Sequence, residues 1–162
     1  MPPLLIAAIT PDEPGFSALR AESQAQNLNM LRRLAENWQN GENRFNAPGE
    51  KLLGAFAYGQ LVGVCGLNAD PFSQQLRAGR IRHLYIGERH RRQGIGHQLL
   101  VSVITHSGAS FDFLNTHAPS TAWSFYEIWG FARCMMSPGL RIVSSVRSSR
   151  RWLTTSTHVT VQ

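Results

Sequence analysis

The sequence predicts a mixed α/β fold, and three observations support this prediction. Two apolar strands are joined by a glycine turn, another strand runs through a basic turn into an amphipathic helix, and an earlier helix carries its leucines on one face. The chain has 162 residues, of which 43% are hydrophobic and 16% charged, so it can bury a sizeable core. Since there is no internal repeat, we expect a single domain over residues 1–162.

The N-terminal part reads as a strand followed by helices. Residues 4–9 are apolar and predict a strand, after which Asp12 is expected to cap a helix and Pro14 to lie in its first turn. The next stretch predicts a helix with one apolar face, because its apolar residues recur at steps of three and four: Leu28, Leu31, Leu34 and Trp38. Gly41 is a natural end for this helix, and residues 37–49 are expected to form a polar loop.

The middle of the chain predicts a hairpin and then a strand that leads into a helix. Residues 52–58 and 61–67 are expected to pair as antiparallel strands, with Gly59-Gln60 forming a type II′ turn. Residues 80–86 predict the next strand. The helix after it has a wide apolar stripe that should lie on the sheet: Ile95, Leu99, Leu100, Val103 and Ile104.

The last third predicts one more helix between strands. Residues 111–116 read as a strand, and Gly130 is expected to end the helix that carries Phe125 and Tyr126. Residues 131–136 and 157–161 look like two final strands. The segment 137–156 between them is rich in Ser and Arg and exceeds usual loop lengths, so it is expected to be either mobile or functional.

Positive charge is concentrated near the C-terminal end. The formal net charge is +6, and the stretch from residue 135 onward has no acidic residue but carries four arginines: Arg141, Arg147, Arg150 and Arg151. A solvated basic loop explains this better than a nucleic-acid or acidic partner, because only Trp152 stands among these arginines to stack on a base. We therefore rank nucleic acid last among the partners.

Cysteine content and the N-terminal segment narrow the class of protein further. Cys65 and Cys134 fall in predicted strands without a CxxC spacing, so neither a disulfide framework nor a metal site is expected. The apolar run near Met1 lacks basic residues before it and is far too short to span a bilayer. We expect a cytoplasmic protein without a membrane partner.

A basic, glycine-containing turn follows the predicted strand at residues 80–86. The pattern Arg91-x-x-Gly94-x-Gly96 lets the backbone approach a ligand closely, and free N–H groups at a helix start attract anions. Arg91 and Arg92 add positive charge. The turn therefore predicts a site for a pyrophosphate group.

Two well-known phosphate-binding motifs fit this turn poorly. A Walker A loop needs Lys after its last glycine, but His97 stands there. A dinucleotide-binding fingerprint needs a third Gly or Ala, and here the residue is Leu99. Neither a P-loop nucleotidase nor a nicotinamide-dependent enzyme is therefore expected.

A second motif lies further along the chain, in the pattern Ala122-x-x-Phe125-Tyr126-x-x-x-Gly130-Phe131. In order and spacing, the two motifs resemble the signatures of the GCN5-related N-acetyltransferase (GNAT) superfamily. The resemblance implies a central, twisted, mostly antiparallel mixed sheet of about seven strands flanked by about four helices. It also implies transfer of the acetyl group of acetyl-CoA directly to a primary amine.

The resemblance assigns roles to particular residues. The pantetheine arm would lie along Leu84, Tyr85 and Ile86, like an added strand. The pyrophosphate would lie on the turn and the helix start: Arg91, Arg92, Gln93, Gly94, Ile95, Gly96 and His97. Asn115 would bond the pantetheine or adenine side. Tyr126 would be the general acid that protonates the departing thiolate.

Several alternatives stay open. Where the histone acetyltransferase branch has a Glu as base, this chain has Arg80, so that carboxylate is missing. His83, His117 and His158 are the titratable candidates for the base, and a water relay to bulk solvent is equally compatible. The acceptor is an unidentified small amine or a protein N-terminus. A non-catalytic sensor or interaction domain that binds acetyl-CoA is the alternative function. Dimers are common in this fold, so a homodimer is a further expectation, without an assigned interface.

Overall fold

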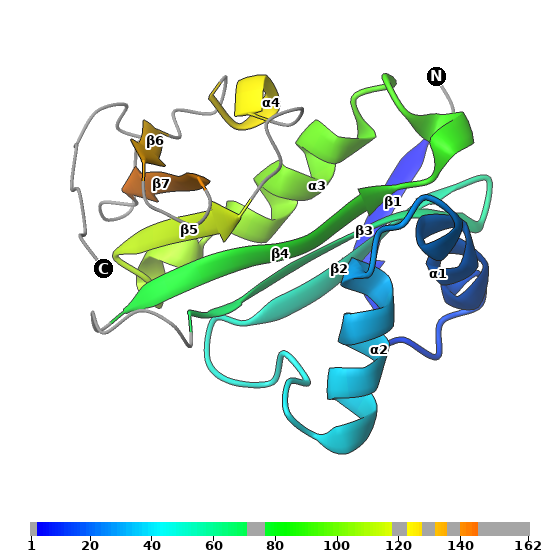
Figure 1. The fold of residues 1–162 in the computed structure, drawn as a ribbon, viewed down its shortest axis with the longest axis horizontal. Helices are drawn as coiled ribbons and strands as arrows, with labels where there is room; N and C mark the ends of the chain where they lie inside the picture. Colours follow the sequence, from blue (N-terminus) through cyan, green and yellow to red (C-terminus); the bar gives the residue numbers. More distant parts are fainter. Residues whose placement is uncertain (1–2, 71–76, 118–122, 128–131, 136–139, 146–162) are drawn as a thin grey trace. The chain divides into compact units, whose positions relative to one another are not determined.

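The computed structural model describes residues 3–70, 77–117, 123–127, 132–135 and 140–145 (Figure 1). These residues form four α-helices and seven strands. In chain order they are β1 Leu4–Ala8, α1 Phe16–Ala25, α2 Met30–Asn40, β2 Lys51–Ala57, β3 Gln60–Ala69, β4 Ala78–Ile86, α3 Ile95–Ile104, β5 Phe113–His117, α4 Trp123–Glu127, β6 Ala132–Met135 and β7 Leu140–Ser145.

The strands follow the order β1-β2-β3-β4-β5-β7-β6. β1, β2 and β3 pair antiparallel, β4 pairs parallel with β5, and β7 pairs antiparallel with both β5 and β6. This confirms the predicted mixed, mostly antiparallel sheet of seven strands. The chain divides into two compact units, one of Met1–Leu67 with Arg82–Thr105 and one of Asn68–Ile81 with His106–Gln162.

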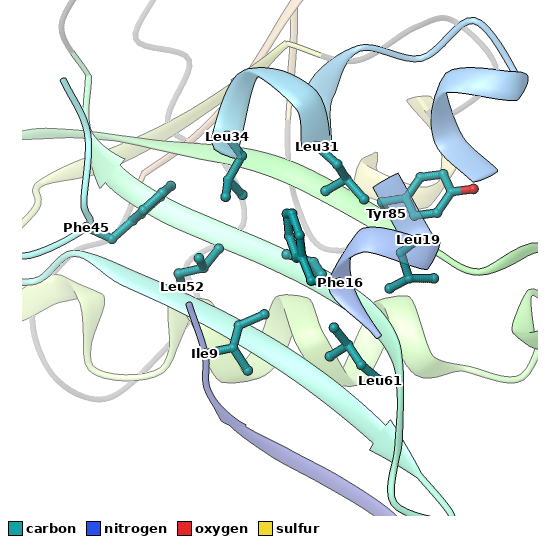
Figure 2. Packing of buried hydrophobic residues seen from close by; sticks show 10 residues of the cluster. Ile9, Phe16, Leu19, Leu31, Leu34, Phe45, Leu52, Leu61 and Tyr85 are labelled. Atoms are coloured by element: carbon teal, nitrogen blue, oxygen red, sulfur yellow. The ribbon is translucent and has the colours of Figure 1, made fainter. Parts of the chain in front are cut away.

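The core of the first unit lies between its strands and helices α1 and α2 (Figure 2). Ten buried residues form this cluster: Ile9, Phe16, Leu19, Leu31, Leu34, Phe45, Leu52, Leu61, Val64 and Tyr85. Leu31 and Leu34 lie on the predicted apolar face of α2, one turn apart, and both are almost completely buried. The helical spacing of the leucines is therefore confirmed, and it fixes which face of α2 packs on the sheet.

Helix α3 covers the opposite face of the same strands. A side chain at Gly63 would meet Leu99 of α3, whereas one at Gly66 would meet the ring of Phe45. These two glycines are three residues apart along β3, and positions an odd number apart face opposite sides of a strand. The predicted apolar stripe of α3 is buried throughout. The end of β4 and the start of α3 are thus attached to packed elements.

The start of α1 differs from the prediction. Gly15, with φ of 93°, occupies the N-cap position, and no side chain caps the helix. Asp12 instead lies in the preceding turn, where its backbone N–H donates to Thr10 Oγ1 at 3.3 Å. A Cβ at Gly15 would lie 3.3 Å from Leu61 Cβ. The left-handed backbone and this close approach both favour glycine, so Asp12 is not the cap.

The hairpin turn between β2 and β3 lies one residue earlier than predicted. Its central residues are Tyr58 and Gly59, with φ of 51° and 74°. Positive φ at both positions is typical of a type I′ turn, so the predicted type II′ turn at Gly59-Gln60 is wrong. The predicted polar loop at 37–49 also begins later, because α2 continues to Asn40 and ends at Gly41 with φ of 82°.

In the second unit, one strand lies where none was predicted. β7, Leu140–Ser145, falls inside the Ser- and Arg-rich segment 137–156 and pairs with both β5 and β6. That segment is therefore not one continuous loop. The predicted end of α4 at Gly130, the predicted strand at 157–161 and the base candidate His158 lie outside the described residues.

Candidate functional site

The predicted pyrophosphate turn connects β4 to α3 within the first unit. After β4 come Gly87, a single 3₁₀ turn at Glu88–His90, and Arg91 in an extended conformation. Arg92 and Gly94 then have φ of 61° and 79°, both in the left-handed region. This backbone reverses the chain and delivers it into α3.

The N-terminus of α3 has the features of an anion site. Gly94 is the N-cap residue, and no side chain caps the helix. The first N–H groups of a helix have no partner within the helix, and the positive end of the helix dipole adds to their attraction for anions. A Cβ at Gly94 would meet nothing within 4 Å, so the backbone there is open to an incoming group. The first N–H groups of the helix are those of Ile95 and Gly96.

β4 is irregular before it reaches the turn. His83 has φ of 61°, yet buried and partly exposed residues still alternate along the strand on both sides of it. Its buried ring packs edge-on against Phe45, with ring centroids 6.0 Å apart. Beyond His83, Tyr85 is buried, whereas Leu84 and Ile86 are partly exposed. The predicted alignment of pantetheine along Leu84 and Ile86 stays a prediction.

The side chain of Tyr85 belongs to the core. Its ring lies in the cluster of Figure 2, with the hydroxyl oxygen directed away from the other labelled side chains, and that hydroxyl donates to Glu22 Oε2 of α1. Burial and, after it, the carboxylate of Glu22 raise the pKa of Tyr85 to about 12, while Arg91 opposes the shift. The phenol of Tyr85 is therefore engaged with α1.

The two arginines of the turn differ in their contacts. Arg91 donates from Nε to the carbonyl oxygen of Ile86 and from Nη2 to Gln26 Oε1, both at 2.9 Å. Its guanidinium lies over the ring of Tyr85, 5.4 Å from the centroid. Arg92 is exposed, and its side chain has no hydrogen bond or ion pair to any residue that the structure describes.

Asn115 and Tyr126 lie in the second unit. Asn115 of β5 is buried, stands opposite Arg80 in register, and donates from Nδ2 to Asp70 Oδ2 at 2.7 Å. Tyr126 of α4 is also buried, with its ring edge-on to Phe125 at 5.0 Å between centroids. Their predicted roles in cofactor binding and catalysis stay predictions.

Three polar residues that sequence reasoning did not single out contact the predicted site residues. Glu22 of α1 bonds to Tyr85, Gln26 at the C-cap of that helix bonds to Arg91, and Asp70 bonds to Asn115. No local motif marks any of them. Glu22 and Gln26 stand four residues apart in a predicted helix, which was the one available signal that they share a face.

The described part of the chain contains neither a cluster of metal-binding side chains nor a membrane-spanning helix. Among those residues, no group of three or more His, Cys, Asp or Glu side chains could hold a metal ion. None of the helices described is both long and apolar enough to cross a bilayer. Cys65 is a free thiol, and burial raises its pKa to about 12, so it remains protonated and unreactive at neutral pH.

Comparison with known structures places the fold among acetyltransferases. A candidate acetyltransferase from Exiguobacterium sp. 255-15 has a TM-score of 0.77 at 23% identity, over 88% of this chain and 93% of the other. A ribosomal-protein-alanine N-acetyltransferase from Brucella melitensis has a TM-score of 0.67 at 21% identity, over 88% and 99%. An N-acetylglutamate synthase from Neisseria gonorrhoeae, complexed with coenzyme A and N-acetyl-glutamate, has a TM-score of 0.68 at 19% identity, over 91% and 36%.

Sequence comparison identifies the family. No curated protein matches the chain significantly. A protein-family model, that of the acetyltransferase (GNAT) domain, matches residues 18–141. The match includes most of α1, the turn before α3, and α4 with Tyr126. Over most of its length, therefore, this chain belongs to the GNAT family of acetyltransferases.

Proposed function

We propose that this protein is an N-acetyltransferase that moves the acetyl group of acetyl-CoA directly to a primary amine. The observation that carries the proposal is the open, uncapped N-terminus of α3 after a left-handed turn, inside the segment that matches the GNAT domain. Such a turn suits a pyrophosphate. The related synthase from Neisseria gonorrhoeae was solved with coenzyme A, which supports the same class of cofactor here.

In the proposed complex, the turn binds the pyrophosphate of acetyl-CoA. The backbone N–H groups from Arg91 to His97 would contact the phosphate oxygens, including those of Gln93 and Gly94, and exposed positive charge beside them would complement the dianion. The pantetheine would extend along Leu84 and Ile86 and pair with the backbone as an added strand. Asn115 would contact the pantetheine or adenine side.

The proposed reaction is a direct attack on the thioester. The amine nitrogen of the acceptor forms a bond to the acetyl carbonyl carbon, and the bond from that carbon to sulfur then breaks. Backbone N–H groups would stabilise the negative oxygen that forms in between. Tyr126 would give its hydroxyl proton to the departing thiolate and recover a proton that the acetylated nitrogen releases. No residue is assigned as the base.

The acceptor is proposed to be a small molecule with a primary amine, or a protein N-terminus. Two of the similar structures carry names that imply such acceptors, the alanine of a ribosomal protein and glutamate. The net charge of +6 disfavours polycationic acceptors, because they would be repelled. We further propose that residues 1–162 act as one catalytic domain in the cytoplasm, without a resident metal, and that the protein can form a homodimer.

The experiment that tests this function combines thiol release with cofactor binding. Purified protein is incubated with acetyl-CoA and a panel of amino acids, small amines and N-terminal peptides, and free coenzyme A is measured. We expect turnover with at least one class, and we expect Tyr126→Phe to lower kcat by about 10²-fold while the Kd for acetyl-CoA changes little.

Two other outcomes would contradict the proposal. Cofactor binding without turnover of any acceptor would favour the non-catalytic sensor, which holds acetyl-CoA and transfers nothing. Unchanged kcat in Tyr126→Phe would remove Tyr126 as the acid. Phe125→Leu is the matched control, since it changes the neighbouring ring and leaves the phenol in place.

A further inference from the structure

Glu22 of α1 and Gln26, the C-cap residue of that helix, hold the 3₁₀ turn Glu88–His90 at its two ends. Glu22 and Gln26 are four residues apart, so they project from the same face of the helix. Glu22 Oε2 accepts the hydroxyl of Tyr85 and also the backbone N–H of Glu88 at 3.2 Å, where the turn begins. Gln26 Oε1 accepts from Arg91 at 2.9 Å, where the 3₁₀ turn ends.

Arg91 connects this helix to the strand end. Its Nε donates to the carbonyl of Ile86, the last residue of β4, while Nη2 donates to Gln26 and the guanidinium carbon lies over the ring of Tyr85. Three protein groups in different directions thus hold one guanidinium. A Lys has a single point charge on a flexible side chain and cannot reproduce the separate hydrogen bonds that Nε and Nη2 of Arg91 donate.

The turn needs such support because its backbone is unusual. Arg92 is not glycine, yet it has φ of 61°, and Gly94 follows with φ of 79°. A left-handed non-glycine residue persists only when its surroundings impose that conformation. A turn that is already formed before the ligand arrives binds more tightly, since less ordering has to occur on binding.

We propose that Arg91, Gln26 and Glu22 are positioning residues that fix the turn from α1, and that Arg92 is the side chain that supplies charge to the pyrophosphate. The assignment of Arg92 to a pyrophosphate rests on the proposed function. The support of the turn by the other three residues does not. It reverses the simpler expectation that both arginines contact phosphate, because Arg91 donates two hydrogen bonds to the protein, whereas the side chain of Arg92 donates none to any residue that the structure describes.

The first test needs no ligand. Backbone hydrogen exchange of residues 92–97 is measured in the wild type, Gln26→Ala, Arg91→Lys and the control Gln24→Ala, an exposed glutamine of the same helix. The proposal predicts at least about fivefold faster exchange of the turn in the first two variants and wild-type exchange in the control. Unchanged exchange in Gln26→Ala and Arg91→Lys would overturn the positioning role.

The second test is calorimetric titration with acetyl-CoA. Arg91→Lys should weaken binding of acetyl-CoA about tenfold, which is nearly as much as Arg91→Ala. In contrast, Arg92→Lys should bind like the wild type, and Arg92→Ala should bind about tenfold more weakly. The double variant Gln26→Ala/Arg91→Lys should bind acetyl-CoA no more weakly than Arg91→Lys alone, since both substitutions remove the same interaction between Gln26 and Arg91. Wild-type affinity in Arg91→Lys would instead make Arg91 a simple charge partner and overturn the proposal.

Failure of the proposed function would give a different pattern. If the wild type binds no acetyl-CoA, the assignment of Arg92 to the pyrophosphate falls together with the proposed function. The hydrogen-exchange result still decides whether Gln26 and Arg91 hold the turn, because it is measured on the ligand-free protein.

Discussion

At the scale of single residues, Gly63 is a position of β3 where a side chain would meet both β4 and α3. A Cβ there would lie 2.7 Å from Ile86 Cδ1 and 3.1 Å from Leu99 Cδ1. Gly63→Ala should therefore lower the free energy of unfolding by about 1–3 kcal/mol, because both side chains must move within a packed layer. Urea denaturation measures this change.

The control for Gly63 is a glycine with space around it. Gly59 lies in the hairpin turn with φ of 74°, and a Cβ there would meet nothing within 4 Å. Asn tolerates this backbone better than other side chains, so Gly59→Asn should change stability little. An equal loss in the two variants would show that overpacking is not the cause at Gly63.

Two buried side chains, the thiol of Cys65 and the phenol of Tyr85, predict a loss of stability in alkaline solution. Burial raises the pKa of Cys65 from 9.0 to about 12 and, together with Glu22, that of Tyr85 from 10.0 to about 12. The folded protein therefore binds these protons more tightly than the unfolded chain does. Their contribution is complete below pH 9 for the thiol and pH 10 for the phenol, and it is lost as the pH rises toward 12.

Denaturation of the wild type and Tyr85→Phe at pH 8, 10 and 11 tests this sign. The variant should lose less stability between pH 10 and 11, because it lacks the phenol proton. It should also be less stable than the wild type at pH 8, since the bond to Glu22 is gone. Parallel pH profiles for the two proteins would contradict the raised pKa of Tyr85.

At the scale of secondary structure, α2 shows how burial fixes a helix. Leu34 is 1% exposed, whereas Arg33 beside it faces solvent. Leu34→Ala should lower the free energy of unfolding by about 2–5 kcal/mol through lost burial and the cavity left behind. Arg33→Ala should cost far less. Thermal or urea unfolding of both variants checks this, and similar losses would contradict the assigned face of the helix.

Elements with strong periodicity were predictable, and their ends were less so. The leucines of α2 and the stripe of α3 were recognised because one-sided burial requires that spacing. The cap of α1 was missed because Gly15 is selected by its contact with Leu61, which lies far away in the sequence. The hairpin turn was misplaced by one residue, since Gly59 suits either turn type and Tyr58 gives no local signal for positive φ.

At the scale of the whole molecule, the sequence located the candidate cofactor turn but not what holds it. The turn was found because glycines and a helix start are local features. Its support depends on pairs such as Glu22 with Tyr85, which come from α1 and β4, and no local spacing encodes such a pair. β7 was missed although Leu140, Ile142 and Val143 are typical strand residues, because the Ser and Arg residues around this short run dominate the composition of the segment.

The most direct measurement is calorimetric titration of the full chain with acetyl-CoA, for the wild type and Gly94→Pro. Proline holds φ near −65°, which is incompatible with the 79° that the turn requires at Gly94. We predict one-to-one binding in the micromolar range for the wild type, and loss of binding in the variant with an unchanged circular dichroism spectrum. Absence of binding by the wild type, or equal binding by both proteins, would contradict the assignment of this turn as the cofactor site.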